Sequence, residues 1–141
     1  MTRIAIRKYP TVRPYPPRLT RFNQPFWRAL QDGEFKTTRC AKCSESTFPP
    51  KPICPRCWCI DMEWVDLSPD GEIYSCTTIH AAPAIFEADA PYAVAIIDLD
   101  QGVRLASRIL NKPDKPAVGL RGSIVATHHP DGPYFAFEIG R

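Results

Sequence analysis

The sequence lacks any long hydrophobic run. Nowhere in its 141 residues does a stretch approach the ~20 consecutive apolar residues that a membrane-spanning helix needs. The first ten residues, MTRIAIRKYP, mix charged and apolar side chains and contain no apolar segment of the kind found in secretion signals. These absences predict a protein that neither crosses a membrane nor is exported, and we expect it in the cytoplasm.

The motifs of the common enzyme sites are also missing. There is no glycine-rich phosphate loop, no G-x-S-x-G elbow and no H-E-x-x-H helix. Of the three histidines, His128 and His129 are neighbours, which on a strand would point to opposite faces. Cys76 and His80 would share a strand face about 13 Å apart, too far for a nucleophile and its base. We expect no catalysis by the chain alone, with independent hydrolase or acyltransferase activity as an alternative.

Acidic residues are absent from residues 1–23, which carry six basic side chains. Residues 24–61 have a net charge of +2 and residues 62–141 a net charge of −5, so the total of +3 hides a strong asymmetry. Four prolines among the first twenty residues disfavour a helix there. We therefore predict an extended basic arm over residues 1–21 that lies along an acidic surface of a partner or of a second copy.

Six cysteines are present, and four of them form two C-x-x-C pairs separated by ten residues. Two such pairs supply the four thiolates that tetrahedral Zn²⁺ takes in a closed, structural site, which can contribute ~10 kcal/mol or more to folding. Reduced free thiols would instead leave this segment almost without a core. Cys59 is an alternative ligand to Cys57, whereas Cys76 fits a small buried side chain in a strand. The predicted zinc ligands are Cys40, Cys43, Cys54 and Cys57.

A short helix is predicted over residues 24–32. Asn23 can cap its start, Phe22 and Trp27 are spaced for a hydrophobic staple, and Gly33 can end it in the left-handed conformation. Its apolar face must dock on another element, because an isolated helix of this length is not stable in water. That face consists of Phe26, Trp27 and Leu30.

Beyond the cysteines, short apolar and β-branched runs alternate with turn residues and predict a small closed barrel, most simply a five- to six-stranded OB-fold. The expected barrel strands are residues 62–67, 72–80, 92–99, 103–110, 120–128 and 134–139. The chain is therefore expected to be mainly β. Its predicted parts are the arm (1–21), the helix with a zinc ribbon (22–61) and the OB-fold domain (62–141).

A zinc ribbon joined to an OB barrel raises the hypothesis of single-stranded nucleic-acid binding. The acidic barrel argues against it, because it would repel phosphates. Arg104 and Arg108 share a strand face, with Lys112 and Lys115 just beyond, and four cations suit a few phosphates better than a polymer. A solvated strand face is the simpler explanation, and nucleic-acid binding is kept as the alternative function.

A series of short fragments occurs in order along about residues 22–139. The fragments are F-W-x-x-L-x-x-G-E-F at 26–35, R-C-x-x-C at 39–43, F-P-P at 48–50, C-P-x-C at 54–57, W-x-x-L-S at 64–68, G-x-I-Y-S at 71–75, P-Y at 91–92 and G-V-R at 102–104. Each fragment alone is weak, but the series is specific, and it resembles the acyl-CoA-associated OB-fold family with an N-terminal rubredoxin-like zinc ribbon, known as the domain of unknown function 35 family. Ser44 departs from the family pattern, which usually has glycine there, and residues 68–70 replace a glycine-containing turn.

The resemblance implies a non-catalytic, acyl-CoA-binding scaffold subunit. Such a chain would be required by a thiolase-like enzyme, an aldolase or an acyltransferase in acyl-CoA, lipid or steroid metabolism, in a hetero-oligomer without nucleic acid or membrane. The ribbon would fix the helix against the barrel and form a groove for pantetheine, while the partner supplies the nucleophile.

Both sets of candidate contact residues have a simpler explanation. The aromatic residues would otherwise be plain core or interface packing, and the cations a solvated strand face. The aromatic candidates for the groove are Phe26, Trp27, Phe48 and Trp64. The candidates for the nucleotide phosphates are Arg104, Arg108 and Lys112.

Overall fold

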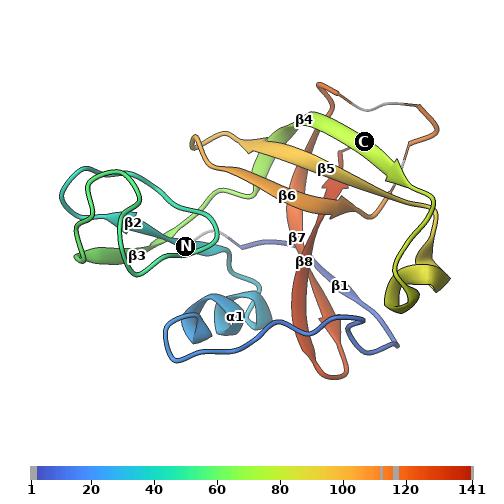
Figure 1. Cartoon of the computed structure of the whole chain (residues 1–141), viewed down its shortest axis with the longest axis horizontal. Helices are drawn as coiled ribbons and strands as arrows, with labels where there is room; N and C mark the ends of the chain where they lie inside the picture. The colour runs from blue at the N-terminus through green and yellow to red at the C-terminus, as the bar shows by residue number, and fades with distance from the viewer. Residues whose placement is uncertain (1–2, 112, 116–117, 141) are drawn as a thin grey trace.

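The fold is mainly β, with a barrel, a smaller lobe containing the four clustered cysteines, and one α-helix between them (Figure 1). The computed structural model describes residues 3–111, 113–115 and 118–140. The elements are β1 (Ile6–Lys8), α1 (Gln24–Gln31), β2 (Lys36–Cys40), β3 (Met62–Asp66), β4 (Asp70–Ile79), the 3-10 helix η1 (Ala84–Asp89), β5 (Tyr92–Leu99), β6 (Arg104–Ile109), β7 (Arg121–His129) and β8 (Gly132–Ile139).

Five strands close into the predicted barrel. β4 pairs antiparallel with both β5 and β7, β5 pairs with β6, and β7 pairs with β8. The ring closes where β6 meets β8 in parallel, through the single register pair Ile109 and Phe137. β1 adds a sixth strand, parallel to β7. The prediction of a five- to six-stranded barrel is confirmed, and the seam between β6 and β8 is its shortest pairing.

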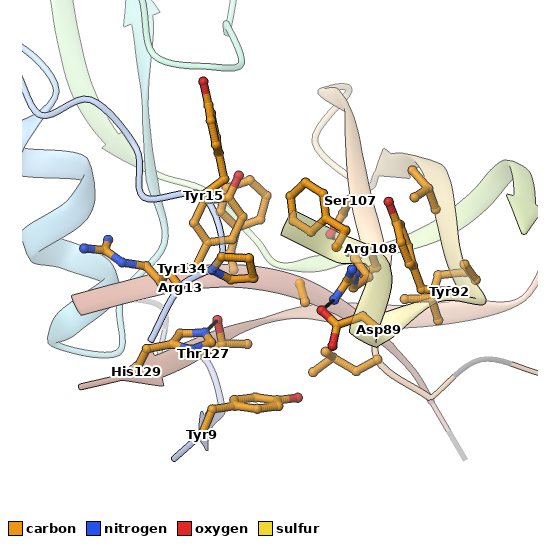
Figure 2. Close-up of a pocket in the computed structure, with 18 of the residues that line it drawn as sticks. Tyr9, Arg13, Tyr15, Asp89, Tyr92, Ser107, Arg108, Thr127, His129 and Tyr134 are labelled. Carbon is orange, nitrogen blue, oxygen red and sulfur yellow. Dashed lines mark hydrogen bonds and ion pairs between the residues drawn. The ribbon is translucent and has the colours of Figure 1, made fainter. Parts of the chain in front are cut away.

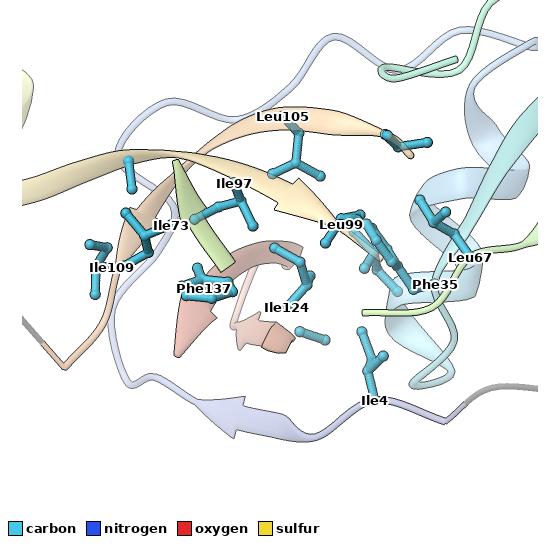
Figure 3. Close-up of a cluster of buried hydrophobic side chains, with 14 of the residues drawn as sticks. Ile4, Phe35, Leu67, Ile73, Ile97, Leu99, Leu105, Ile109, Ile124 and Phe137 are labelled. Carbon is cyan, nitrogen blue, oxygen red and sulfur yellow. The ribbon is translucent and has the colours of Figure 1, made fainter. Parts of the chain in front are cut away.

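Alternation along the strands fills the barrel. In β5 every second residue, from Ala93 to Leu99, is buried, as expected for a strand with one face toward a core. Four large side chains from different strands are fully buried in the centre (Figure 3), and each such side chain contributes about 1.5–3 kcal/mol relative to exposure. They are Ile73, Ile97, Ile124 and Phe137.

The first expected barrel strand is part of the other sheet. All five residues of β3 pair antiparallel with β2, from Met62 opposite Cys40 to Asp66 opposite Lys36. The prediction that residues 62–67 open the barrel is therefore wrong. A period-2 pattern identifies a strand but does not say which neighbour it pairs with.

The helix α1 ends as predicted and begins differently. Gly33 has φ +77°, and the N–H groups of Gly33 and Glu34 donate to the carbonyls of Leu30 and Ala29, which is a Schellman closure. Asn23 stands at the N-cap, but its side chain does not cap the helix and instead bonds the backbone of Arg18 and Thr20. Neither α1 nor η1, the helices in the described part of the chain, is long and apolar enough to cross a membrane.

The arm lies on its own barrel. The Arg7 guanidinium donates two hydrogen bonds, of 2.8 and 2.7 Å, to Glu138, and Arg13 pairs with Asp131 at 3.3 Å. The acidic surface that the arm was expected to find on another molecule is therefore, for these two arginines, the chain's own β8 and the turn before it. The sequence indicated the charge complementarity but not that it is intramolecular.

Gly122 lies where β7 crosses β8 and β4. A methyl group there would overlap the Glu138 carbonyl oxygen and approach the Ile139 Cα to 2.9 Å. Because backbone atoms form this contact, Gly122→Ala is expected to destabilise the protein by about 1–3 kcal/mol, measured by urea unfolding. Gly140→Ala, whose added Cβ would lie 3.4 Å from its nearest atom, is the matched control and should be near neutral. Equal effects of the two substitutions would contradict this account of the crossing.

Candidate functional site

The four predicted zinc ligands lie together. The Sγ atoms of Cys40, Cys43, Cys54 and Cys57 are all within 4.8 Å of one another, and two of the sulfur pairs are 3.5 Å apart. A tetrahedron with Zn–S bonds of about 2.3 Å has edges of about 3.8 Å, so this spacing fits a zinc ion at the centre. With four thiolates the site is closed, which is the arrangement of a structural metal rather than a catalytic one.

Backbone turns aim the sulfurs. The N–H groups of Cys43 and Cys57 donate to the sulfurs of Cys40 and Cys54, at 3.4 and 3.5 Å. The residue after each second cysteine has positive φ, +65° at Ser44 and +64° at Trp58. Glycine adopts this conformation most easily, so the backbone at Ser44 and Trp58 has a conformational cost that glycine would not have.

The thiols of the cluster perturb one another. A hydrogen bond from the backbone N–H of Cys43, aided by neighbouring donors, lowers the pKa of Cys40 to about 6. At Cys57 the N–H of Cys59 acts in the same direction, but burial and the other three sulfurs outweigh it and raise the pKa to about 12. Four thiolates this close repel each other, so full ionisation needs a cation between them.

The two remaining cysteines are not part of the cluster. Cys59 lies outside it, and its sulfur accepts the N–H of Asp61 at 3.4 Å, so the geometry favours Cys57 as the fourth ligand. Cys76 is half-buried in β4 and packs against the barrel core, close to its predicted role.

The interior of the cysteine lobe is polar. Throughout residues 36–61, all of which the structure describes, no aliphatic or aromatic side chain is fully buried. The Thr38 and Thr47 hydroxyls share a 2.7 Å hydrogen bond, and Thr37 donates to the Thr47 carbonyl. The buried side chains are Thr37, Thr38, Cys40, Thr47 and Cys54. A lobe with this interior depends on metal ligation for its stability.

Two of the four predicted groove aromatics are packing groups at the junction of helix, ribbon and barrel. Phe26 is 3% exposed and meets Phe48 edge to face at 5.8 Å. Both rings also contact Phe35 and Phe135, at centroid distances of 5.7–6.3 Å. At the edge of this cluster, Trp27 stacks on Tyr134. Trp64 packs against Phe22, at a ring-centroid distance of 5.6 Å.

The predicted phosphate ligands already have partners within the chain. Arg104 forms a two-pronged pair with Asp98, at 2.5 and 3.0 Å, and its guanidinium lies 3.8 Å from the Tyr74 ring centroid. Arg108 pairs with Asp89 at 3.2 Å and lies over the Tyr92 ring. Lys112 is outside the described residues.

A cavity of about 630 Å³ lies between the arm, η1 and the strands β5, β6 and β8 (Figure 2). Of the seven predicted acyl-CoA contacts, only Arg108 is among the described residues that line it. Tyr9 and Arg13 of the arm line it from the opposite side. These arm residues were not predicted, because no local pattern shows that a segment near the start of the chain folds back over the barrel.

The histidines of β7 form hydrogen bonds that link this strand to α1 and to the arm. His128 Nε2 bonds the carbonyl of Leu30 at 3.2 Å and so ties β7 to α1. His129 bridges the Thr11 carbonyl and the Thr127 hydroxyl, at 2.9 and 3.1 Å, and stacks on Tyr9. Among the described residues, neither histidine is placed to activate a nucleophile.

Removal of the metal is expected to unfold the cysteine lobe. Cys43→Ser, or a strong chelator, should abolish binding of one Zn²⁺ per chain, measured by elemental analysis, and should lower the melting temperature. Cys59→Ser is the matched control and should retain both the metal and the stability. Retention of full stability without metal would contradict the assignment of a structural role.

The thiol pKa values also predict how metal affinity depends on pH. In the metal-free cluster the pKa of Cys57 is about 12, so this thiol is protonated near neutral pH. Zinc that binds at this pH must therefore displace protons. Affinity should therefore fall as the pH falls. Calorimetry in buffers of different ionisation enthalpy measures the released protons, and a result of none would rule out a four-thiolate site.

Comparison with proteins of known sequence agrees with the two-part architecture. Residues 27–58 match the family model described as ChsH2, rubredoxin-like zinc ribbon domain, and residues 64–127 match ChsH2, C-terminal OB-fold domain. A DUF35 domain-containing scaffold protein of Methanocaldococcus jannaschii is 38% identical over 85 residues, which are 59% of this chain and 60% of that protein. The match thus spans somewhat less than two thirds of that relative.

Two further relatives are covered more fully. The Methanothermobacter thermautotrophicus DUF35 domain-containing scaffold protein is 33% identical, over 66% of this chain and 72% of its own length. Benzoylsuccinyl-CoA thiolase subunit BbsA of Geobacter metallireducens is 29% identical, over 70% of this chain and 67% of its own length.

Solved structures show the same fold. A chain of the Ltp2-ChsH2(DUF35) aldolase superposes with a TM-score of 0.75 at 29% identity, covering 88% of this chain and 98% of that one. A DUF35 protein of unknown function from Sulfolobus solfataricus matches with a TM-score of 0.62 at 16% identity, over 85% of this chain and 86% of its own, which supports the fold alone. The ribbon, the barrel and these sequence relatives together show that the chain belongs to the DUF35 family.

Proposed function

We propose that this chain is a non-catalytic scaffold subunit that contacts acyl-CoA and works with a thiolase-like enzyme in acyl-CoA, lipid or steroid metabolism. The observation that carries this proposal is the match to 98% of a chain of the Ltp2-ChsH2(DUF35) aldolase. The similarity to a benzoylsuccinyl-CoA thiolase subunit points in the same direction.

The chemistry of the described residues supports a non-catalytic role. The cysteine cluster has four thiol ligands, which leaves a bound zinc ion no free position for substrate. The two histidines nearest the cavity and the helix are engaged with backbone carbonyls. The nucleophile and base of the reaction would therefore come from the partner.

The ribbon carries an exposed apolar surface suited to a subunit contact. Trp58 is 79% exposed and Ile60 is 80% exposed, and Ile53 nearby is 45% exposed. Tryptophan is enriched among the residues that dominate binding energy at protein interfaces. Trp58 also has a positive φ, a backbone conformation that costs free energy for any residue with a side chain. We assign this surface to the thiolase-like partner.

The cavity supports acyl-CoA as the ligand. Its volume of about 630 Å³ lies in the ~300–1,000 Å³ range of small-molecule sites, and apolar side chains supply most of its walls. Arg108 is the predicted contact residue that borders it. Arg104 keeps its proposed role only as a contact outside the cavity, because it does not line the cavity and pairs with Asp98 of β5.

The alternative of nucleic-acid binding has less support. OB-folds bind single strands across the face of their second and third strands, which here are β5 and β6. The arm and η1 border the cavity on that side (Figure 2), and the nearby cations Arg13 and Arg108 are each paired with an aspartate. A polyanion would have to displace these pairs.

The proposal predicts that Trp58→Ala weakens binding to the thiolase-like protein that co-purifies with the tagged chain, on the order of tenfold or more, by surface plasmon resonance. The fold should be unaffected, because the removed side chain is exposed. Ile85→Ala, at a 53% exposed residue of η1, is the control and should bind as the parent does.

Activity supplies the decisive comparison. The partner should turn over its acyl-CoA substrate faster with this chain than without it. An unchanged rate in the absence of the chain, or acyl-CoA turnover by the isolated chain, would overturn the proposed role.

A further inference from the structure

The cavity is built from residues far apart in sequence, which the fold brings to one place (Figure 2). Its walls are aromatic rings contributed by four separate segments: the arm, η1, β5 and β8. Small side chains on three strands also line it, Ala93, Ala106 and Ala136. The aromatic wall residues include Tyr9, Tyr15, Phe86, Tyr92 and Tyr134. Rings interspersed with alanines leave a space suited to flat apolar groups.

The position of the cavity follows from the barrel seam. β6 and β8 meet in register only at Ile109 and Phe137, so toward Ala106 the strands are not joined as a ladder. The arm crosses above this opening, held by the Tyr9 N–H bond to the His128 carbonyl and by Arg13 on Asp131. An opening in the barrel wall thus becomes a covered cavity.

The charges that border the cavity are already neutralised. Arg13 pairs with Asp131 and also donates to the carbonyls of Asp131 and Pro133. Arg108 pairs with Asp89 while lying 4.1 Å from the Tyr92 ring centroid. An anionic ligand would have to compete with a carboxylate for each guanidinium, whereas a neutral ligand would leave both pairs intact.

Two polar side chains of the walls are likewise engaged. The Ser107 hydroxyl, in a residue 7% exposed, donates to the Arg108 carbonyl at 3.1 Å. Both ring nitrogens of His129 have partners, Thr11 and Thr127. Recognition in such a site therefore rests on shape and ring stacking, with the hydroxyls of the lining tyrosines as the hydrogen-bonding groups for a neutral ligand.

From these observations we infer that the cavity binds a neutral, flat, ring-bearing apolar group, and that phosphates stay outside it. The identification of this group with the acyl portion of a thioester rests on the proposed function. The arm residues Tyr9 and Tyr15 would then select the acyl group, while the nucleotide end of the ligand lies toward solvent or the partner.

The test uses the full-length, zinc-loaded chain and androst-4-ene-3,17-dione, a neutral four-ring ketone, in isothermal titration calorimetry. Saturable binding of one molecule per chain is expected. Ala106→Trp, which adds a large side chain at an exposed strand position that lines the cavity, should weaken it by about tenfold or more. Thr77→Trp, on the exposed side of β4 and away from the cavity, is the matched control and should bind as the parent does.

Tyr15→Ala gives a second readout that does not depend on the folding of a larger side chain. Tyr15 is 72% exposed, so its removal should leave the fold intact and weaken binding about three- to tenfold. Excess adenosine 3′,5′-bisphosphate should not displace the ketone. No binding, equal binding by Ala106→Trp and parent, or displacement by the nucleotide would each overturn the inference.

The two proposals can fail separately. Ketone binding without any effect of the chain on a thiolase-like partner would sink the scaffold function and leave the cavity site standing. Partner activation by a chain that binds no ketone would do the reverse.

Discussion

Cross-linking of two thiolate pairs through one metal ion is the constraint on which the rest of the structure depends. The lobe that it holds has threonines and cysteines inside, so packing alone would not fix its shape. Phe48 lies in the loop between the cysteine pairs and inserts its ring among Phe26, Phe35 and Phe135. Fixing the loop therefore fixes the ring. The metal in this way determines how helix and barrel meet, although it touches neither.

Basic residues of the arm pair with acidic residues of the same chain. An acid-free segment beside an acidic barrel suggests an interaction between molecules, yet Arg7 and Arg13 find Glu138 and Asp131 within the chain. Exposed ion pairs of this kind contribute only about 0–1 kcal/mol each. Their role is to position the arm. Together with the β1–β7 pairing they place it over the seam between β6 and β8.

The sequence predicted local features well and their spatial partners poorly. Cysteine spacing gave the ligand set, alternation gave the barrel strands to within two residues, and Gly33 gave the end of α1, because each depends on nearby residues. It assigned β3 to the barrel, although this strand pairs with β2, and it placed Asn23 as a side-chain cap, although its amide binds the arm. Of the cavity only Arg108 was among the predicted contact residues, since Tyr9, Phe86, Tyr92 and Tyr134 meet only in three dimensions.

Several aromatic residues that line the cavity lie outside the two domains that match the family models. The matched domains span residues 27–58 and 64–127, whereas Tyr9 and Tyr15 precede both and Tyr134 follows them. Tyr134 stacks on Trp27 and Phe135 and so belongs to the aromatic junction, whereas Tyr15 is exposed and can change without disturbing the junction or the metal. Under the binding proposed above, a substitution in the covering arm would change the group that the cavity accommodates and leave the rest of the frame in place. The cost of such a change is small, since an exposed tyrosine such as Tyr15 contributes little to folding.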